Sequence, residues 1–223
     1  MHTRDLIQFL AELSENNNRA WFVMNKPRYD ILRLEFLELV TKLIPVVGKF
    51  DPEVANCNPR KALFRINRDM RFSRDKSPYK TAFSAAITAS GLKKPSQGGG
   101  PAYYFHVDAN GVLLVAGGEY MPPPDRLKTI RQHVVADAAG FSKVLRNKRL
   151  KDTFGDLQDE GKLTRPPKGF DADTPHIEYI KMKSFIVWNE TSLKDGIPAD
   201  LGKELVAGFR DAFPLVAWLR QAK

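Results

Sequence analysis

The chain has 223 residues, 43% of them hydrophobic and 27% charged, and it carries a formal net charge of +9. This composition suits one globular domain over residues 1–223, and no stretch approaches the roughly 18 consecutive apolar residues that a membrane span needs. Cys57 is the only cysteine, which excludes an intramolecular disulfide and a metal cage built from cysteines. Because no secretory signal is visible either, we expect a soluble, cytoplasmic protein.

Helices are predicted for the first part of the chain. Apolar residues at three- and four-residue spacing indicate a first helix over residues 4–13, and the asparagines at 16–18 end it and favour capping the next. A short helix follows over residues 19–22. Pro27 then suits the first turn of a longer helix, whose end is marked by Pro45 and Gly48.

Strands are predicted for the middle of the chain. The patterns indicate strands over residues 62–67, 81–89, 103–107 and 112–119. The last two are joined through Asp108-Ala109-Asn110-Gly111, where the Asn-Gly pair tolerates the positive φ angles of a tight hairpin. Residues 93–101 have the composition of a flexible surface loop.

The remaining segments are mostly helical. Helices are expected after the prolines at 122–124, over residues 138–145 and 148–154, and over residues 201–219 with a kink at Pro214; a last strand is expected over residues 184–188. Helices at both chain ends and hairpin-linked strands between them predict an α+β fold. We expect a central, mostly antiparallel sheet with helices from both chain ends packed on it.

A basic cluster stands out between Arg60 and Lys80. Eight basic residues against two acidic ones leave this short segment with a charge of +6. Arginine presents a planar fork of donors that matches carboxylate and phosphate oxygens, and Phe72 and Tyr79 suit packing against a base or sugar. The candidate anion-binding residues are Arg65, Arg68, Arg71, Lys76, Tyr79 and Lys80. The alternative is a solvated loop in which Asp69 and Asp75 pair with neighbouring cations.

A second basic group follows later in the chain, and its candidate anion-binding residues are Lys168, Lys181 and Lys183. Residues 166–170 (PPKGF) would form a rigid turn that presents Lys168, and the alternative is a structural turn before a short helix. If this turn folded against the first cluster, the two would form one electropositive cleft.

Other chemistry is weakly indicated. Glu119 follows two glycines at the end of a predicted strand, where it could act as a general base or pair with an arginine of the basic cluster. The four histidines are widely separated and lack the paired spacing of a zinc site, so no metal is predicted. The glycines at 98–100 lack the lysine and hydroxyl of a P-loop.

Several stretches together resemble a known family. They are NNNRAWFVMNKPRYD, FRINRDMRFSRDKSPYK, GGEYMP, RPPKGFDADTPHIEYIKMKSF and FPLVAWL, in this order along the chain. In these stretches the sequence is similar to family 2461 of the domains of unknown function, which comprises bacterial and fungal conserved hypothetical proteins. The resemblance runs from about Leu6 to Leu219. It implies one domain, no known cofactor and no established activity, and it suggests that the basic cluster is the family's hallmark.

Three functional hypotheses follow. The first is a binding module for a phosphate-bearing or other anionic ligand, with nucleic acid among the candidates. The second is an enzyme that acts on a phosphorylated or carboxylated small molecule, with arginines as substrate clamp and Glu119 as base. The third is a protein-interaction module whose basic cluster docks on an acidic surface.

Overall fold

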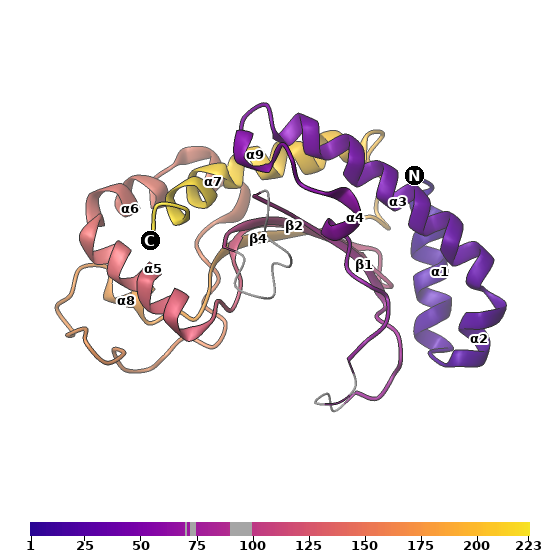
Figure 1. The fold of residues 1–223 in the computed structure, drawn as a ribbon, viewed down its shortest axis with the longest axis horizontal. Coiled ribbons are helices and arrows are strands. Elements are labelled where there is room, and N and C mark those ends of the chain that lie inside the picture. Colours follow the sequence, from indigo (N-terminus) through magenta and orange to yellow (C-terminus); the bar gives the residue numbers. More distant parts are fainter. Residues whose placement is uncertain (70, 72–74, 90–99) are drawn as a thin grey trace. The chain divides into compact units, whose positions relative to one another are not determined.

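A computed structural model of the chain describes residues 1–69, 71, 75–89 and 100–223. Figure 1 shows the elements of the first half, which are α1 (Thr3–Glu15), α2 (Arg19–Met24), α3 (Lys26–Val47), the 3₁₀ turn η1 (Pro52–Val54), α4 (Pro59–Ala62), β1 (Ala82–Thr88), β2 (Ala102–Asp108) and β3 (Val112–Glu119). The second half contains α5 (Pro124–Ala136), α6 (Ala138–Leu145), α7 (Lys148–Phe154), α8 (Ile177–Ile180), β4 (Phe185–Ser192) and α9 (Leu201–Leu219). Among the described residues, none of these helices has the length and apolar character needed to cross a membrane.

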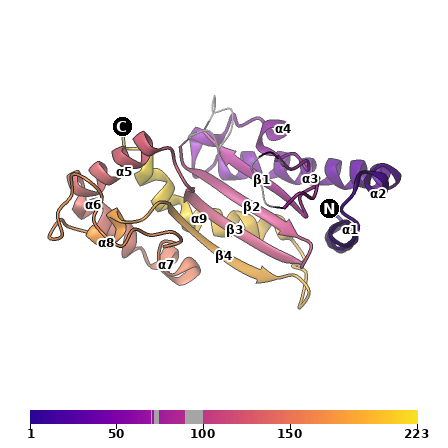
Figure 2. The same cartoon turned by 90° about the horizontal axis from the view of Figure 1, so that it is seen from below.

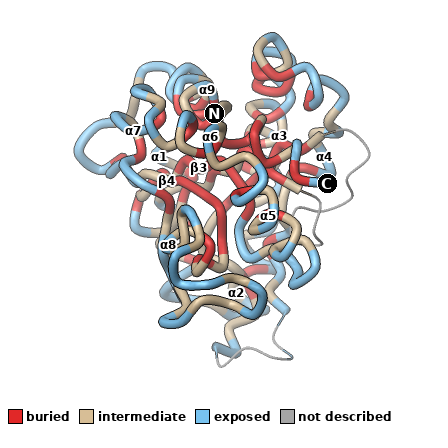
Figure 3. The backbone as a smooth tube through the Cα atoms, turned by 90° about the vertical axis from the view of Figure 1, so that its left-hand side faces the viewer, coloured by how far each residue is buried: buried red, intermediate tan, exposed pale blue. Residues whose placement is uncertain are grey.

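The strands form one antiparallel sheet in the order β1-β2-β3-β4, with the N-terminal helices and α9 packed against it (Figure 2). The predicted α+β class with helices from both chain ends on the sheet is therefore confirmed. Strand positions are mostly buried (Figure 3).

The chain divides into two compact units, described here separately. Unit 1 comprises residues 1–90, 104–115 and 190–206, and unit 2 comprises residues 91–103, 116–189 and 207–223. A single domain over residues 1–223 stays a prediction.

Unit 1 contains the predicted N-terminal helices. Asn18 caps α2 by accepting a hydrogen bond from the Trp21 N–H, as the asparagine run suggested. The apolar positions of α1 are fully buried, and they are Leu6, Phe9, Leu10 and Leu13. Arg28 of α3 donates to Asp5 and Glu12 of α1, so an ion pair network fixes these two helices together.

Helix α3 lies along one face of the sheet (Figure 1). Phe36 packs its ring against Phe83 of β1 and Phe105 of β2, with centroid separations of 5.6 and 5.2 Å. Because side chains alternate along a strand, the neighbours of Phe105 on β2 lie on the opposite face. Those neighbours are Tyr104 and His106, and they are only half-buried.

The chain before β1 differs from the prediction. Residues 62–67 do not form a regular strand: Ala62 ends α4, and only Leu63 and Asn67 make isolated bridges, to Ala85 and Tyr79. Helix α4 was not predicted, although Asn58 followed by Pro59 is a readable start signal. The Asn58 side chain accepts from two backbone N–H groups at the start of α4.

The β2–β3 hairpin is present at the predicted place. Its turn closes with a 3.0 Å hydrogen bond from Gly111 N–H to the Asp108 carbonyl, and only Gly111 has a positive φ, of 73°. The Asp108 carboxylate also accepts from the N–H groups of Asn110 and Val112. The turn is therefore held by an aspartate side chain and one left-handed glycine.

Unit 2 has its own apolar core, in which residues of α5–α7 pack with β4 and the end of α9. The aromatic members include Phe141, Phe185 and Trp218. Gly117 lets α9 approach β3 closely, because a Cβ there would lie 2.5 Å from the Ala212 Cβ. The predicted final helix is present with Pro214 inside it.

Candidate anion-binding site

The two ends of the basic cluster lie side by side as a short antiparallel ribbon. Arg68 N–H donates to the Pro78 carbonyl (2.9 Å) and Lys80 N–H donates to the Ile66 carbonyl (2.8 Å). We call residues 65–68 and 78–80 the basic ribbon. Figure 1 shows it descending from the sheet on the side opposite α3.

Tyr79 attaches the basic ribbon to the N-terminal helices. The Asn17 side chain donates to the Tyr79 carbonyl (3.0 Å) and accepts from its N–H (3.1 Å), so it substitutes for a strand neighbour. The Tyr79 ring stacks on Phe22 with a centroid separation of 4.0 Å and is 7% exposed. The contacts of Tyr79 are therefore those of an anchor for the ribbon.

Two of the candidate arginines have carboxylate partners. Arg68 forms an ion pair with Asp75, and Arg71 donates to both carboxylate oxygens of Asp69 at 2.8 and 3.0 Å. Hydrogen bonds from the Arg71 side chain and backbone lower the pKa of Asp69 to about 2. Local pairing, the alternative interpretation of the cluster, thus accounts for Asp69 and Asp75.

Two other cations of the ribbon stand without such a partner among the described residues. Within the described part of the chain, Arg65 and Lys80 form no ion pair with a carboxylate. The pKa of Lys80 is lowered, first by burial and then by the positive charges of Arg65 and Arg68. Three cations therefore converge where the local potential is positive, which is the condition that favours a bound anion.

The remaining candidates of the first cluster are Lys76, which is exposed, and Phe72, which lies outside the described residues together with Met70, Ser73 and Arg74. The role suggested for the Phe72 ring therefore stays a prediction. Most of the glycine-rich stretch also lies outside the described residues, which resume at Gly100.

The second basic group lies in unit 2. Lys162 and Lys181 both pair with Glu178 at 2.9 Å, so two cations share one carboxylate. Lys168 is exposed and Lys183 is partly buried. The formation of one cleft by the two basic groups stays a prediction, as does the role of these lysines.

Glu119 is buried in unit 2 and its carboxylate is bound by Arg126 of α5. The Arg126 Nε lies 3.1 Å from both carboxylate oxygens of Glu119. The same guanidinium donates to the carbonyls of Leu219 and Ala222 at the end of the chain. Glu119 thus fastens β3, through Arg126, to α5 and the C-terminal residues.

A further group of side chains lies next to the basic ribbon on the half-buried face of the sheet. The Phe64 ring stands 5.9 Å from the Tyr104 ring, which stands 5.7 Å from the His106 ring. Lys80 Nζ lies 5.3 Å from the Phe64 centroid. We call Phe64, Tyr104 and His106 the aromatic row. This row was not predicted, although Tyr104 and His106 are two apart in a strand and so share a face.

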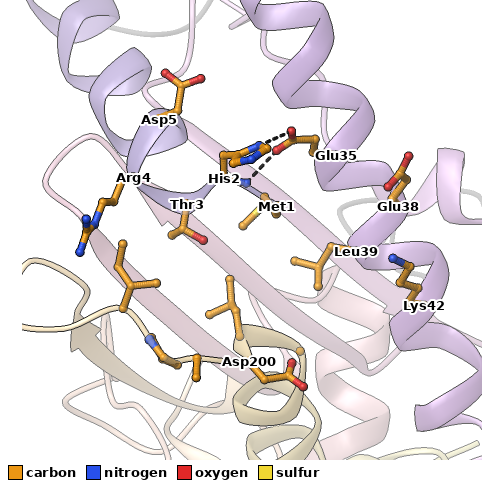
Figure 4. Close-up of a pocket in the computed structure, with 15 residues that line it drawn as sticks. Met1, His2, Thr3, Arg4, Asp5, Glu35, Glu38, Leu39, Lys42 and Asp200 are labelled. Carbon is orange, nitrogen blue, oxygen red and sulfur yellow. Dashed lines mark hydrogen bonds and ion pairs between the residues drawn. The ribbon is translucent and has the colours of Figure 1, made fainter.

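A cavity of unit 1 lies elsewhere, between the start of α1, α3 and residues 197–202 (Figure 4). Its volume is about 690 Å³, and His2 lies across it with Nδ1 2.6 Å from a Glu35 oxygen. Hydrogen bonds and charge from His2 outweigh the effect of burial and lower the pKa of Glu35. None of the predicted site residues lines this cavity.

Among the described residues, no three His, Cys, Asp or Glu side chains are placed to hold a metal ion.

Comparison with known proteins identifies the class of protein that this α+β fold and basic cluster represent. The model of the family described as "Conserved hypothetical protein (DUF2461)" matches residues 5–218, so the chain belongs to this family. The resemblance found in the sequence is thereby confirmed. No curated protein and no solved structure matches the chain.

Proposed function

We propose that the basic ribbon binds a phosphate-bearing anionic ligand and that nucleic acid is the first ligand to test. The observation that carries this proposal is the backbone pairing of residues 66–68 with 78–80, which brings Arg68 and Lys80 together beside Arg65; of these three cations only Arg68 has a carboxylate partner among the described residues. Like charges held together are unfavourable in the free protein, and a polyanion would relieve this repulsion.

The paired arginines are compatible with this function. The Arg71–Asp69 pair is exposed, with side-chain exposures of 77% and 43%. Exposed ion pairs contribute little to stability because water screens them and the side chains lose entropy. A phosphate can therefore replace Asp69 on Arg71 at small cost. Lys76 is a further ligand candidate on the same segment, and Lys168, Lys181 and Lys183 would assist if unit 2 contributes.

The alternatives have less support. An enzyme with Glu119 as base would require this carboxylate to leave Arg126, to which it is bound in the interior. A protein-interaction module would use the same cations, and the Phe64 ring beside Lys80 suits a nucleic-acid ligand as well as a protein surface. The cytoplasmic location remains part of the proposal: Cys57 is partly buried and burial raises the pKa of its thiol, which suits an inert reduced cysteine.

The test is a fluorescence-anisotropy titration with a labelled single-stranded oligonucleotide at several salt concentrations. For the double variant Arg65→Gln/Lys80→Gln we expect affinity at low salt to fall by about tenfold. The slope of log affinity against log salt concentration should fall by the amount that corresponds to about two phosphate contacts. The control variant Lys128→Gln/Arg149→Gln loses the same charge from exposed positions on α5 and α7 and should bind almost as the wild type does.

Two results would overturn the proposal. One is an absence of binding to oligonucleotides, nucleotides and inorganic polyphosphate at low salt. The other is an equal loss of affinity in the ribbon variant and the control variant, because net charge rather than a site would then explain the binding.

A further inference from the structure

The aromatic row continues from the basic ribbon across the half-buried face of β2. Each step along it is short: Lys80 Nζ to the Phe64 ring is 5.3 Å, Phe64 to Tyr104 is 5.9 Å, and Tyr104 to His106 is 5.7 Å between centroids. All of these residues belong to unit 1. The site of positive charge is therefore continuous with a row of aromatic rings that meet edge to face, with interplanar angles of 82° and 74°.

The rings of this row are not part of the core under α3. Phe105, between Tyr104 and His106, is fully buried and packs on Phe36, whereas Tyr104, His106 and Phe64 are each half-buried. The described ring contacts of Tyr104 come from Phe64 and His106, not from a helix. Each of these three residues therefore keeps part of its surface exposed.

The polar atoms of the row are held in place. The Tyr104 hydroxyl lies 3.2 Å from His106 Nδ1 and also hydrogen bonds with Ser84 of β1. Burial lowers the pKa of His106 despite the opposing effect of Asp108 and Glu190, so the imidazole is neutral at neutral pH. When the tyrosine donates to Nδ1, the imidazole proton resides on Nε2. That atom has no hydrogen-bond partner among the described residues and is free to donate to a ligand.

We propose that the aromatic row binds the base of a nucleotide whose phosphate is bound by the basic ribbon. This inference rests on the proposed function and specifies its ligand: an unpaired nucleotide, in a single strand or free. Ring faces bind bases by stacking, which requires an unstacked base, and a neighbouring cationic surface holds the phosphate. A duplex would offer its phosphates but not its base faces.

The test compares an oligothymidylate with an abasic oligomer of the same length and charge. For the wild type we expect about tenfold tighter binding of the oligothymidylate, because base stacking on aromatic side chains contributes beyond the phosphates. Tyr104→Leu should remove this preference while leaving abasic binding unchanged. Tyr104→Phe keeps the ring and should retain most of the preference. Tyr120→Leu removes an exposed ring of unit 2 and should have no effect.

Competition with thymidine monophosphate separates the two sources of the ligand. If thymidine monophosphate displaces the oligomer at a concentration comparable to that of the oligomer's binding sites, the ligand is a free nucleotide. If thymidine monophosphate fails to displace the oligomer, the ligand is a single strand. Both outcomes support the inference as long as the preference for bases depends on Tyr104.

The inference fails if the wild type binds both oligomers equally while Arg65→Gln/Lys80→Gln reduces binding; the ribbon would then bind phosphates without reading bases. If neither oligomer binds at low salt, the proposed function itself fails. The wild-type comparison does not depend on any variant, so equal binding of the two oligomers overturns the inference even if Tyr104→Leu does not fold.

Discussion

Two arginine–carboxylate pairs of this protein have the same chemistry and opposite surroundings. In unit 2, Glu119 is 3% and Arg126 is 21% exposed, and the guanidinium also binds two backbone carbonyls. In unit 1, Arg71 and Asp69 are 77% and 43% exposed and bind each other across two residues of the chain. Only the guanidinium of the first pair also reaches a segment far away in the sequence, through the carbonyls of Leu219 and Ala222.

This difference decides what each pair can do. A buried charge that loses its partner stays without solvation, so the Glu119–Arg126 pair is fixed once the chain has folded. An exposed pair exchanges readily with water, salt or a ligand. We therefore assign the buried pair to stability and the exposed arginines to binding, and each of the predictions below tests this division.

The largest effect is expected from Glu119→Gln. It leaves the Arg126 guanidinium in the interior without its carboxylate, and breaking a buried ion pair in this way costs about 3–5 kcal/mol. Urea unfolding measures the change in the free energy of unfolding. Oligonucleotide binding by the folded fraction should remain unchanged, because Glu119 and the ribbon lie in different units.

The matched control is Asp152→Asn, which breaks the exposed pair with Lys148 on α7, where the side chains are 59% and 86% exposed. The free energy of unfolding should change by less than about 0.5 kcal/mol. Equal losses in the two variants would contradict the division between buried and exposed pairs.

The next effect concerns the glycine before Glu119. Gly118 has a φ of +129°, and a Cβ on it would lie 2.2 Å from the Phe185 carbonyl oxygen of β4. Gly118→Ala should therefore cost about 3 kcal/mol in the free energy of unfolding, from strain and the displaced strand. Gly155→Ala is the control, since Gly155 also has a positive φ but open space around it. It should cost about 1 kcal/mol, and a similar loss at both positions would show that the close approach of the strands is unimportant.

The sequence predicted the helices well because their signals are local. The spacing of Leu6, Phe9, Leu10 and Leu13 depends only on the helical repeat, and all four are fully buried. The Asn110-Gly111 turn is equally local, because one glycine and one aspartate side chain define it. Such elements require no knowledge of the rest of the chain.

The shape of the candidate site could not be predicted in the same way. The anchor of Tyr79 is Asn17, which is 62 residues away, and the partner of Glu119 proved to be Arg126 of the following helix. Local pairs such as Arg71 with Asp69 could be anticipated from spacing alone. The neighbours that turn Tyr104 into part of a row come from other segments, so composition gave no signal for it.

A smaller effect is expected when the exposed carboxylates are removed. Asp69→Asn/Asp75→Asn releases Arg71 and Arg68 from their pairs and adds two net positive charges, so we expect oligonucleotide affinity at low salt to rise by about fivefold. The titration described above measures it. The variant Asp125→Asn/Asp159→Asn makes the same charge change at exposed positions of unit 2. An equal gain there would mean that Arg68 and Arg71 do not contact the ligand.

The smallest effect is the pH dependence contributed by Asp69. Its pKa is lowered from 3.8 to about 2 in the folded protein, chiefly by hydrogen bonds from Arg71. The folded state therefore holds this proton less strongly than the unfolded state does. The resulting stabilisation is complete above about pH 4 and is lost as the pH falls towards 2. The difference in unfolding free energy between wild type and Asp69→Asn should shrink over this interval.

Carboxyl chemical shifts recorded against pH measure the Asp69 titration directly. High salt should return its pKa towards 3.8, because the pair with Arg71 is exposed and screened. The cost of Glu119→Gln should hardly depend on salt, since ions do not reach a buried pair. If instead Asp69 titrates near 3.8 at low salt, the Arg71 guanidinium does not hold this carboxylate in solution.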